Sequence, residues 1–174
     1  MSKIGQPMTD MLAVEGMKLT GSHLVNVYEG RGTADDWDAV TWASTIGGMV
    51  INTAGVTVAH GMEHPASGLK DIVHGKGLAA LTPMIIEASY QGAPEKFAKL
   101  AKLFGGEKAE DLAGKVRELL EDIELTCTLS DLGIEEKDIP WMAENCMKVS
   151  AHSIANNPVV FSQEEIAEIY KKAL

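Results

Sequence analysis

The sequence feature that most constrains the fold lies between Asp38 and Glu63, where 24 consecutive residues include no Lys, Arg, Asp or Glu. A run of this length can either span a bilayer or form a helix buried inside a globular protein. Polar side chains such as Asn52, Thr57 and His60, together with four glycines, favour the second alternative. We therefore expect a chain without a membrane span, in which this stretch forms a central helix packed on several sides.

Helix start and stop signals define the first part of the chain. Pro7 predicts the start of a helix that runs to about Tyr28, where the glycines at 30 and 32 end it. Thr33 then predicts the N-cap of a second helix with acidic residues in its first turn, which suit the positive end of the helix dipole.

The later part of the chain has the same helical character. Pro94 opens a run of apolar residues at helical spacing, and Ser162 with Glu165 forms the capping box of a final helix. Only residues 56–58 and 159–161 have an extended pattern, and both segments are too short to build a sheet. The sequence therefore predicts an all-α, multi-helix bundle.

The chain has the length of one ordinary domain. Gly105 and Gly106 either separate two lobes, 1–105 and 106–174, or form a tight turn between packed helices. The three tryptophans occupy helical positions and are expected in the core: Trp37, Trp42 and Trp141.

Composition limits the partners and the location. The 15 basic and 25 acidic residues give a net charge of −10, which argues against nucleic acid as a partner. The residues from Met1 to Gly16 lack a basic region followed by an apolar core, so no secretory signal is expected. Two cysteines, Cys127 and Cys146, fit a reducing compartment. We therefore expect a cytoplasmic protein.

Three of the five histidines fall in the run HGMEHPASGLKDIVH, from His60 to His74. His60 and His64 are four residues apart, so on a helix they project from one face. A short turn that begins near Pro65 can fold His74 back toward His60. Because neutral imidazole is a common ligand of divalent transition metals, the three rings predict a metal or proton-transfer site. The alternative is a set of core histidines satisfied by hydrogen bonds.

The same run contains a second motif, H-x-x-E-H, formed by His60, Glu63 and His64. In the inverted zinc-peptidase signature two histidines hold zinc and the glutamate acts as a base. Pro65 argues against this hypothesis, because proline removes a backbone donor and disturbs the helix that such a site requires.

The histidine segment also resembles the signature of the iron-containing (group III) alcohol dehydrogenases. The resemblance rests on HGMEHPASGLKDIVHGKGLAALTP, from His60 to Pro83, with its three spaced histidines and its final Leu-x-Pro step. It extends over essentially the whole chain through PMTDMLA at 7–13, LGIEEKDI at 132–139, Asn157-Pro158 and Ile169-Tyr170.

This resemblance implies a two-domain enzyme that interconverts small alcohols with aldehydes or ketones by hydride exchange with NAD or NADP. An N-terminal α/β domain would bind the nucleotide, and a C-terminal all-helical domain would hold a divalent metal, iron or zinc. By position, His60 and His74 would be two of the four metal ligands. His64 would stand beside the metal as a proton relay or as a residue that orients the substrate.

Two parts of the family pattern have no counterpart in this sequence. The other two metal ligands belong to an Asp-x-x-x-His motif, and the nucleotide-binding domain carries a Gly-Gly-Gly-Ser loop; neither motif occurs here. Residues 1–174 therefore resemble a single helical metal-binding domain without its nucleotide-binding domain. We expect such a chain to be inactive alone and to hold a metal weakly or not at all.

Two kinds of partner follow from this interpretation. The chain would either complete an alcohol dehydrogenase with a nucleotide-binding half, or act as a non-catalytic helical domain that forms homo-oligomers or binds another protein. In both cases an apolar surface should be left uncovered on the first helix, with Met8, Met11 and Met17 as candidates.

Overall fold

A computed structural model describes residues 1–174 and contains helices and no β-strand, which confirms the all-α prediction. The α-helices are α1 (Pro7–Tyr28), α2 (Ala34–Ala54), α3 (Val58–Lys70), α4 (His74–Ser89), α5 (Pro94–Leu103), α6 (Asp111–Asp122), α7 (Ile139–Val149), α8 (Ala151–Ala155) and α9 (Gln163–Ala173). Single 3₁₀ turns cover Tyr90–Gly92 and Glu136–Asp138. None of the helices is both long and apolar enough to cross a membrane.

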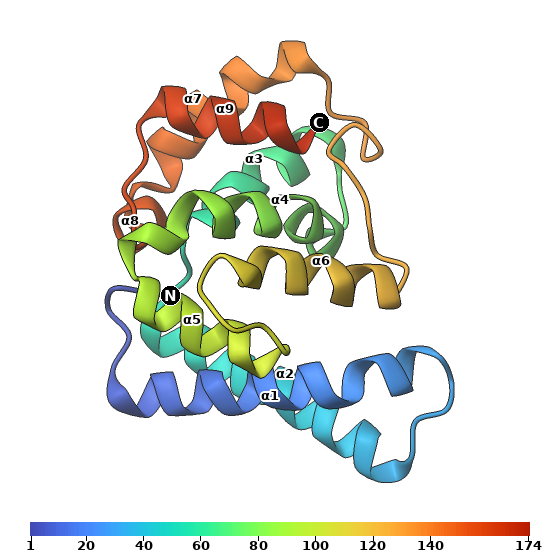
Figure 1. The fold of residues 1–174 in the computed structure, drawn as a ribbon. Helices are drawn as coiled ribbons and strands as arrows, with labels where there is room; N and C mark the ends of the chain where they lie inside the picture. Colours follow the sequence, from blue (N-terminus) through green and yellow to red (C-terminus); the bar gives the residue numbers. More distant parts are fainter.

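Helices α1 and α2 form an antiparallel hairpin at one end of the molecule (Figure 1). The helix α1 begins at Pro7 and ends at Tyr28, as predicted, with Gln6 as N-cap and Thr9 completing the capping box. Thr33 caps α2 through its hydroxyl, which accepts a hydrogen bond from the Asp36 amide. Local capping chemistry therefore sets the start of both helices of this hairpin.

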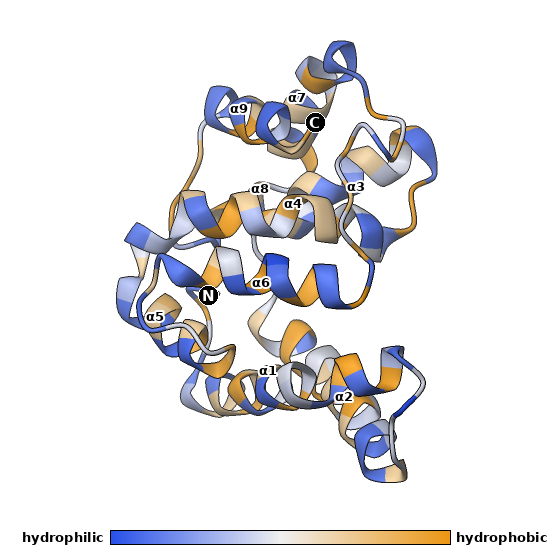
Figure 2. Ribbon diagram, turned by 45° about the vertical axis from the view of Figure 1, so that its right-hand side comes forward, coloured by the Kyte–Doolittle hydropathy of each residue, from blue (hydrophilic) through white to orange (hydrophobic).

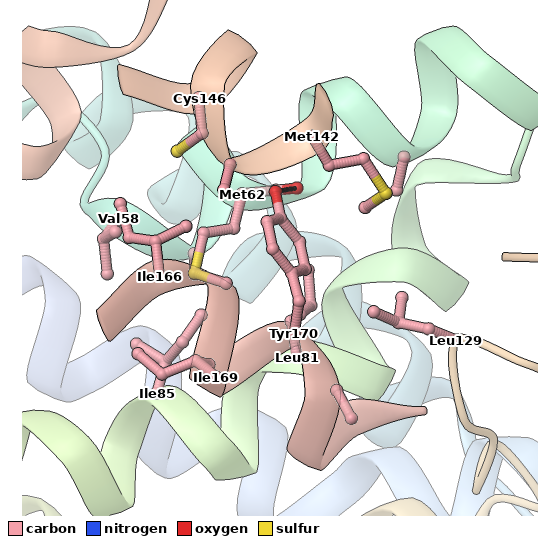
Figure 3. Packing of buried hydrophobic residues seen from close by; sticks show 14 of the residues in the cluster. Val58, Met62, Leu81, Ile85, Leu129, Met142, Cys146, Ile166, Ile169 and Tyr170 are labelled. Atoms are coloured by element: carbon pink, nitrogen blue, oxygen red, sulfur yellow. Dashed lines mark hydrogen bonds between the residues drawn. The ribbon is translucent and has the colours of Figure 1, made fainter. Parts of the chain in front are cut away.

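The main hydrophobic core lies at the other end, where α3, α4, α7, α8 and α9 pack around a cluster of 19 buried residues. Tyr170 of α9 stands at its centre, surrounded by the side chains shown in Figure 3. Its hydroxyl donates a hydrogen bond to the main-chain carbonyl of Met62 in α3. This bond ties the last helix to the helix that carries two of the candidate site histidines.

A second cluster of six buried residues joins α4, α5 and α6. It includes Ile86, Phe97 and Leu112, and therefore contains residues from both sides of the Gly105-Gly106 turn. The helix α1 packs against this region, where a Cβ atom on Gly21 would lie 3.0 Å from the ring of Phe104. The hairpin thus rests on the smaller cluster, and the larger one supports α3 and α4.

The expectation of a central buried helix was wrong. The uncharged run forms most of α2 and continues into α3, and within α2 only Asp36, Ala43, Ile46 and Ala54 are buried. The helix packs along one side against α1. Apolar residues on its other sides, such as Trp42 and Met49, remain exposed, and Figure 2 shows apolar as well as polar stretches along it. Most of the run therefore lies in a surface helix, and only its last part, at Val58, Ala59 and Met62 in α3, belongs to the main core.

The tryptophans were also placed wrongly. The residues expected in the core are 57%, 49% and 47% exposed: Trp37, Trp42 and Trp141, respectively. Helical spacing gives each side chain a face of its helix, and in all three cases that face has no neighbouring element.

Candidate metal centre

Helices α3 and α4 form a tight corner that brings the histidine segment back on itself. His60 lies in the first turn of α3, His64 one turn later, and His74 is the first residue of α4. The reversal takes place at Asp71, whose φ of 52° lies in the left-handed region, a conformation that Asp tolerates better than most residues. The corner is thus only three residues long, from 71 to 73.

The three imidazole rings converge at this corner. The ring centroids of His60 and His74 are 5.2 Å apart, those of His64 and His74 5.8 Å, and those of His60 and His64 6.2 Å. His64 and His74 are exposed, while His60 is half-buried. The structure therefore brings the three predicted histidines together, and their roles as ligands and relay stay predictions.

The sequence suggested a turn that begins near Pro65, but α3 neither ends nor turns there. It continues to Lys70 with Pro65 buried inside it. A proline at this place withholds the donor that the carbonyl of Gly61 would otherwise accept. The neighbouring residues Met62 and Ala66 are fully buried, and the Tyr170 hydroxyl supports the Met62 carbonyl, so tertiary packing outweighs the local penalty.

Glu63 is the functional candidate whose position the sequence did not reveal. Its side chain is completely buried, one Oε atom contacts Nδ1 of His74, and the other contacts the hydroxyl of Ser67. The ligand atoms of Glu63, His64 and His74 all lie within 4.8 Å of one another, close enough for one cation. Both carboxylate oxygens already have partners on the protein side, so Glu63 is placed behind His74. One feature of the sequence pointed to Glu63: it is the first charged residue after the uncharged run.

This geometry does not fit the zinc-peptidase hypothesis. The glutamate of H-x-x-E-H would have to face the metal and activate water there. Glu63 points into the protein instead and is occupied by His74 and Ser67.

The surroundings of His60 favour its neutral imidazole form. Burial lowers the pKa of His60, and the neighbouring rings of His74 and His64 lower it further. A histidine with a lowered pKa carries a free lone pair at neutral pH, which is the form that binds metals.

A cleft of about 290 Å³ opens beside His60. Its walls include Met1, Ile51 at the end of α2, and Leu78 with Thr82 on α4. The cleft therefore joins the hairpin, the N-terminal segment and the histidine corner, and it has the dimensions of a small-molecule site.

Asn156, at the C-terminal end of α8, organises one wall of this cleft. Its amide nitrogen donates to the carbonyls of Ala54 and Val56, and its side-chain oxygen accepts from the hydroxyl of Ser2 and the amide of Ile4. One buried side chain thus holds the end of α2 and the N-terminal segment together.

His23 and the two cysteines lie outside the histidine corner and have structural surroundings. Nδ1 of His23 lies 2.7 Å from Oδ1 of Asp36 at the far end of the hairpin. Burial raises the pKa of the Cys146 thiol to about 12, and burial also raises that of Cys127. Neither cysteine is therefore an activated nucleophile.

The sequence profile of the Fe-containing alcohol dehydrogenase family, C-terminal part, matches residues 1–174. The chain belongs to this family. Both the fold and the histidine segment now agree with the resemblance seen in the sequence.

Two relatives illustrate the match to iron-containing alcohol dehydrogenases. The 1,3-propanediol dehydrogenase of Klebsiella pneumoniae is 31% identical over 180 residues, which cover 99% of this chain and 46% of the relative. Alcohol dehydrogenase 4 of Saccharomyces cerevisiae strain S288c is 28% identical over 176 residues, with 99% and 46% coverage. The chain thus spans about half the length of these relatives.

Solved structures of the family have the same helical arrangement. A 1,3-propanediol oxidoreductase superposes with a TM-score of 0.90 at 32% identity, covering 99% of this chain and 47% of that protein. The alcohol dehydrogenase from Oenococcus oeni gives a TM-score of 0.92 at 28% identity, again with 99% and 47% coverage. The family implies a divalent metal and NAD(P) in the full enzyme.

Proposed function

We propose that this chain is the metal-binding half of an NAD(P)-dependent alcohol dehydrogenase, with residues 1–174 acting as a single helical domain. The observation that carries the proposal is the convergence of three imidazoles at the α3–α4 corner. Their chemistry fits a divalent transition metal, iron or zinc, because neutral imidazole binds such ions. The location we infer is the cytoplasm, where the two free cysteines stay reduced.

In this proposal His60 and His74 hold the metal through ring nitrogens. A bound divalent cation would supply Lewis-acid stabilisation of a substrate alkoxide, and the nicotinamide would accept the hydride. His64 is exposed and adjacent to both rings, so it can take up the hydroxyl proton of the substrate or hold the substrate oxygen in place. The neighbouring cleft would receive the carbon skeleton of a small alcohol.

Two histidines do not complete a tetrahedral site. The remaining ligands and the nucleotide would come from a nucleotide-binding half, which would correspond to the part of the relatives that this chain does not match. The exposed rings of His64 and His74 and the open cleft are accessible to such a partner.

Mixing this chain with a nucleotide-binding half of the family, in the presence of Zn²⁺ or Fe²⁺ and NAD(P), tests the proposal. We expect a complex that oxidises small alcohols, with activity abolished by His60→Ala and retained by His23→Ala, a change at the far end of the hairpin. A metal-loaded complex without alcohol oxidation would contradict the proposed activity, and failure to form any complex would contradict the proposed partner.

A second function has an observation of its own. Met8 and Met11 are 62% and 64% exposed, and α2 adds Trp37, Trp42 and Met49 to the uncovered apolar surface, whereas Met17 is only partly exposed. Such a surface is typical of a protein–protein contact. In this alternative the chain forms homo-oligomers through the hairpin. Light scattering after size exclusion should then give a dimer or larger species, and a strict monomer at high concentration would contradict it.

A further inference from the structure

The buried Glu63 lies behind the histidine corner and is not explained by metal binding through His60 and His74 alone. Its exposed fraction is 0%, and it is the one acidic residue in the main core region of α3. A buried carboxylate is costly unless hydrogen bonds compensate it. The side chains that contact this carboxylate therefore indicate its role.

One oxygen of Glu63 contacts Nδ1 of His74, which is the first residue of α4. When Nδ1 of an imidazole donates a hydrogen bond to a carboxylate, the proton stays on Nδ1 and the lone pair is on Nε2. Carboxylates fix metal-binding histidines in this way in many sites, and they also make the ring a stronger base.

The other oxygen of Glu63 contacts the hydroxyl of Ser67, one helical turn later. The same hydroxyl lies 3.0 Å from the carbonyl oxygen of Ile72 in the corner that precedes α4. Ser67 thus connects the carboxylate to the backbone that presents His74. Both oxygens are engaged and sealed from solvent, so Glu63 is not available as a direct ligand.

Space for Glu63 is made by a glycine on the facing helix. A Cβ atom on Gly77 would lie 2.7 Å from an Oε atom of Glu63 and 2.8 Å from its Cγ. By contrast, a Cβ atom on Gly75, in the same turn of α4, would meet nothing within 4 Å. Within this turn of α4, a side chain is therefore excluded at the position that faces the carboxylate and tolerated at Gly75.

We propose that Glu63 is a positioning residue for His74: it holds the ring in the Nδ1–H tautomer, with Nε2 free for a divalent cation shared with His60. This inference rests on the proposed function, because it assumes that His74 is a ligand. Ser67 and Gly77 support this role: Ser67 fixes the carboxylate through a hydrogen bond, and Gly77 leaves room for it.

The first test needs no metal. In the ¹⁵N-labelled full chain at pH 8, two-bond proton–nitrogen correlations report the tautomer of each histidine. We expect His74 to be the Nδ1–H form, and Glu63→Gln to shift it toward a mixture, while Glu87→Gln on the surface of α4 leaves it unchanged. A His74 tautomer that is the same in Glu63→Gln and the native chain would overturn the proposal.

The second test uses Zn²⁺ alone, with affinity measured by competition with a chelating dye. We expect Glu63→Gln and Gly77→Ala to weaken zinc binding by about tenfold or more, and Gly75→Ala to change it by less than about twofold. The thermal midpoint of the metal-free chain should not fall in Glu63→Gln, because a neutral amide is less costly to bury than a carboxylate. Equal zinc affinities in the Gly77 and Gly75 variants would contradict the proposal.

These outcomes separate the inference from the function on which it rests. If the native chain binds no zinc, the proposed metal site fails, and the tautomer measurement still decides whether Glu63 controls His74. If zinc binding removes the hydrogen bond at His74 Nδ1, Glu63 has become a ligand and the positioning role is wrong. Should Glu63→Gln fail to fold, the Gly77→Ala and Gly75→Ala pair provides the same decision with the carboxylate retained.

Discussion

The two ends of this molecule are built differently. The bundle that contains α3, α4, α7, α8 and α9 encloses 19 buried apolar residues, among them the fully buried Tyr170, Met62 and Leu81. The α1–α2 hairpin has long, well-capped helices, yet Ile46 is the only large apolar side chain that it buries fully.

The bundle and the hairpin therefore have different structural roles, which the sequence alone does not distinguish. The bundle provides the rigidity that holds His74 and Glu63 at a fixed distance, because both helices of the corner are anchored in its core. The hairpin provides one wall of the cleft and an apolar surface that faces outward. The cleft and the histidine corner thus lie between a well-packed part and a more open part of the molecule.

The largest expected effect comes from shortening a core side chain in the bundle. Leu81→Ala should reduce the free energy of unfolding by about 2–5 kcal/mol, because Leu81 is completely buried and its removal leaves a cavity. Met11→Ala on the hairpin removes a side chain of similar size that is 64% exposed, so its effect should stay within about 0.5 kcal/mol. Urea unfolding measures both, and equal losses would mean that the hairpin surface is covered in solution.

An intermediate effect is expected at the helix caps. Thr33→Ala in the hairpin and Ser162→Ala in the bundle each remove a hydroxyl that caps the third amide of a helix, at a cost of about 1 kcal/mol. The two variants should differ in how far the loss of protection against hydrogen exchange extends along the chain. Hydrogen exchange should quicken only in the first turn of α2 for the Thr33 variant, but throughout the bundle for the Ser162 variant. Identical exchange patterns would show that the two ends unfold as one unit.

The smallest expected effect is on the pH dependence of stability, and it comes from a residue at the tip of the hairpin. Hydrogen bonds from His23, from Thr33 and from Asn26 hold the pKa of Asp36 well below its usual range. A carboxyl with a lowered folded-state pKa stabilises the fold above its unfolded-state pKa, and this contribution is lost as the pH falls below about 4.

Asp36→Asn should therefore lower stability at pH 7 and flatten the loss of stability as the pH falls below about 4. The matched variant Asp35→Asn, at an exposed position in the same turn, should leave the slope unchanged. Unfolding at a series of pH values measures the slope of stability against pH for both variants. An unaltered slope in Asp36→Asn would show that Asp36 does not contribute to the loss of stability in acid.

The sequence predicted what local chemistry determines. The start of α1 at Pro7, the Thr33 cap and the Ser162–Glu165 capping box follow from interactions within four residues, and all are found in the structure. The spacing of the histidines also predicted that His60 and His74 can meet.

Features that depend on distant contacts could not be predicted in the same way. Whether the apolar side chain of Trp42 is buried depends on a neighbour that α2 does not have. The continuation of α3 through Pro65 depends on Tyr170, which is more than 100 residues away in the sequence. Glu63 could be recognised as a partner of His74 only after the corner and the gap at Gly77 were known.

The measurement that tests the account most directly is anomalous X-ray diffraction from crystals of this chain grown with Zn²⁺. With Zn²⁺ in excess over this weak site, we expect a zinc peak at the α3–α4 corner, about 2.0–2.1 Å from ring nitrogens of His60 and His74, with Glu63 still bonded to the back of the His74 ring. A zinc ion bound elsewhere, for example at His23 and Asp36, with the corner empty, would contradict the account.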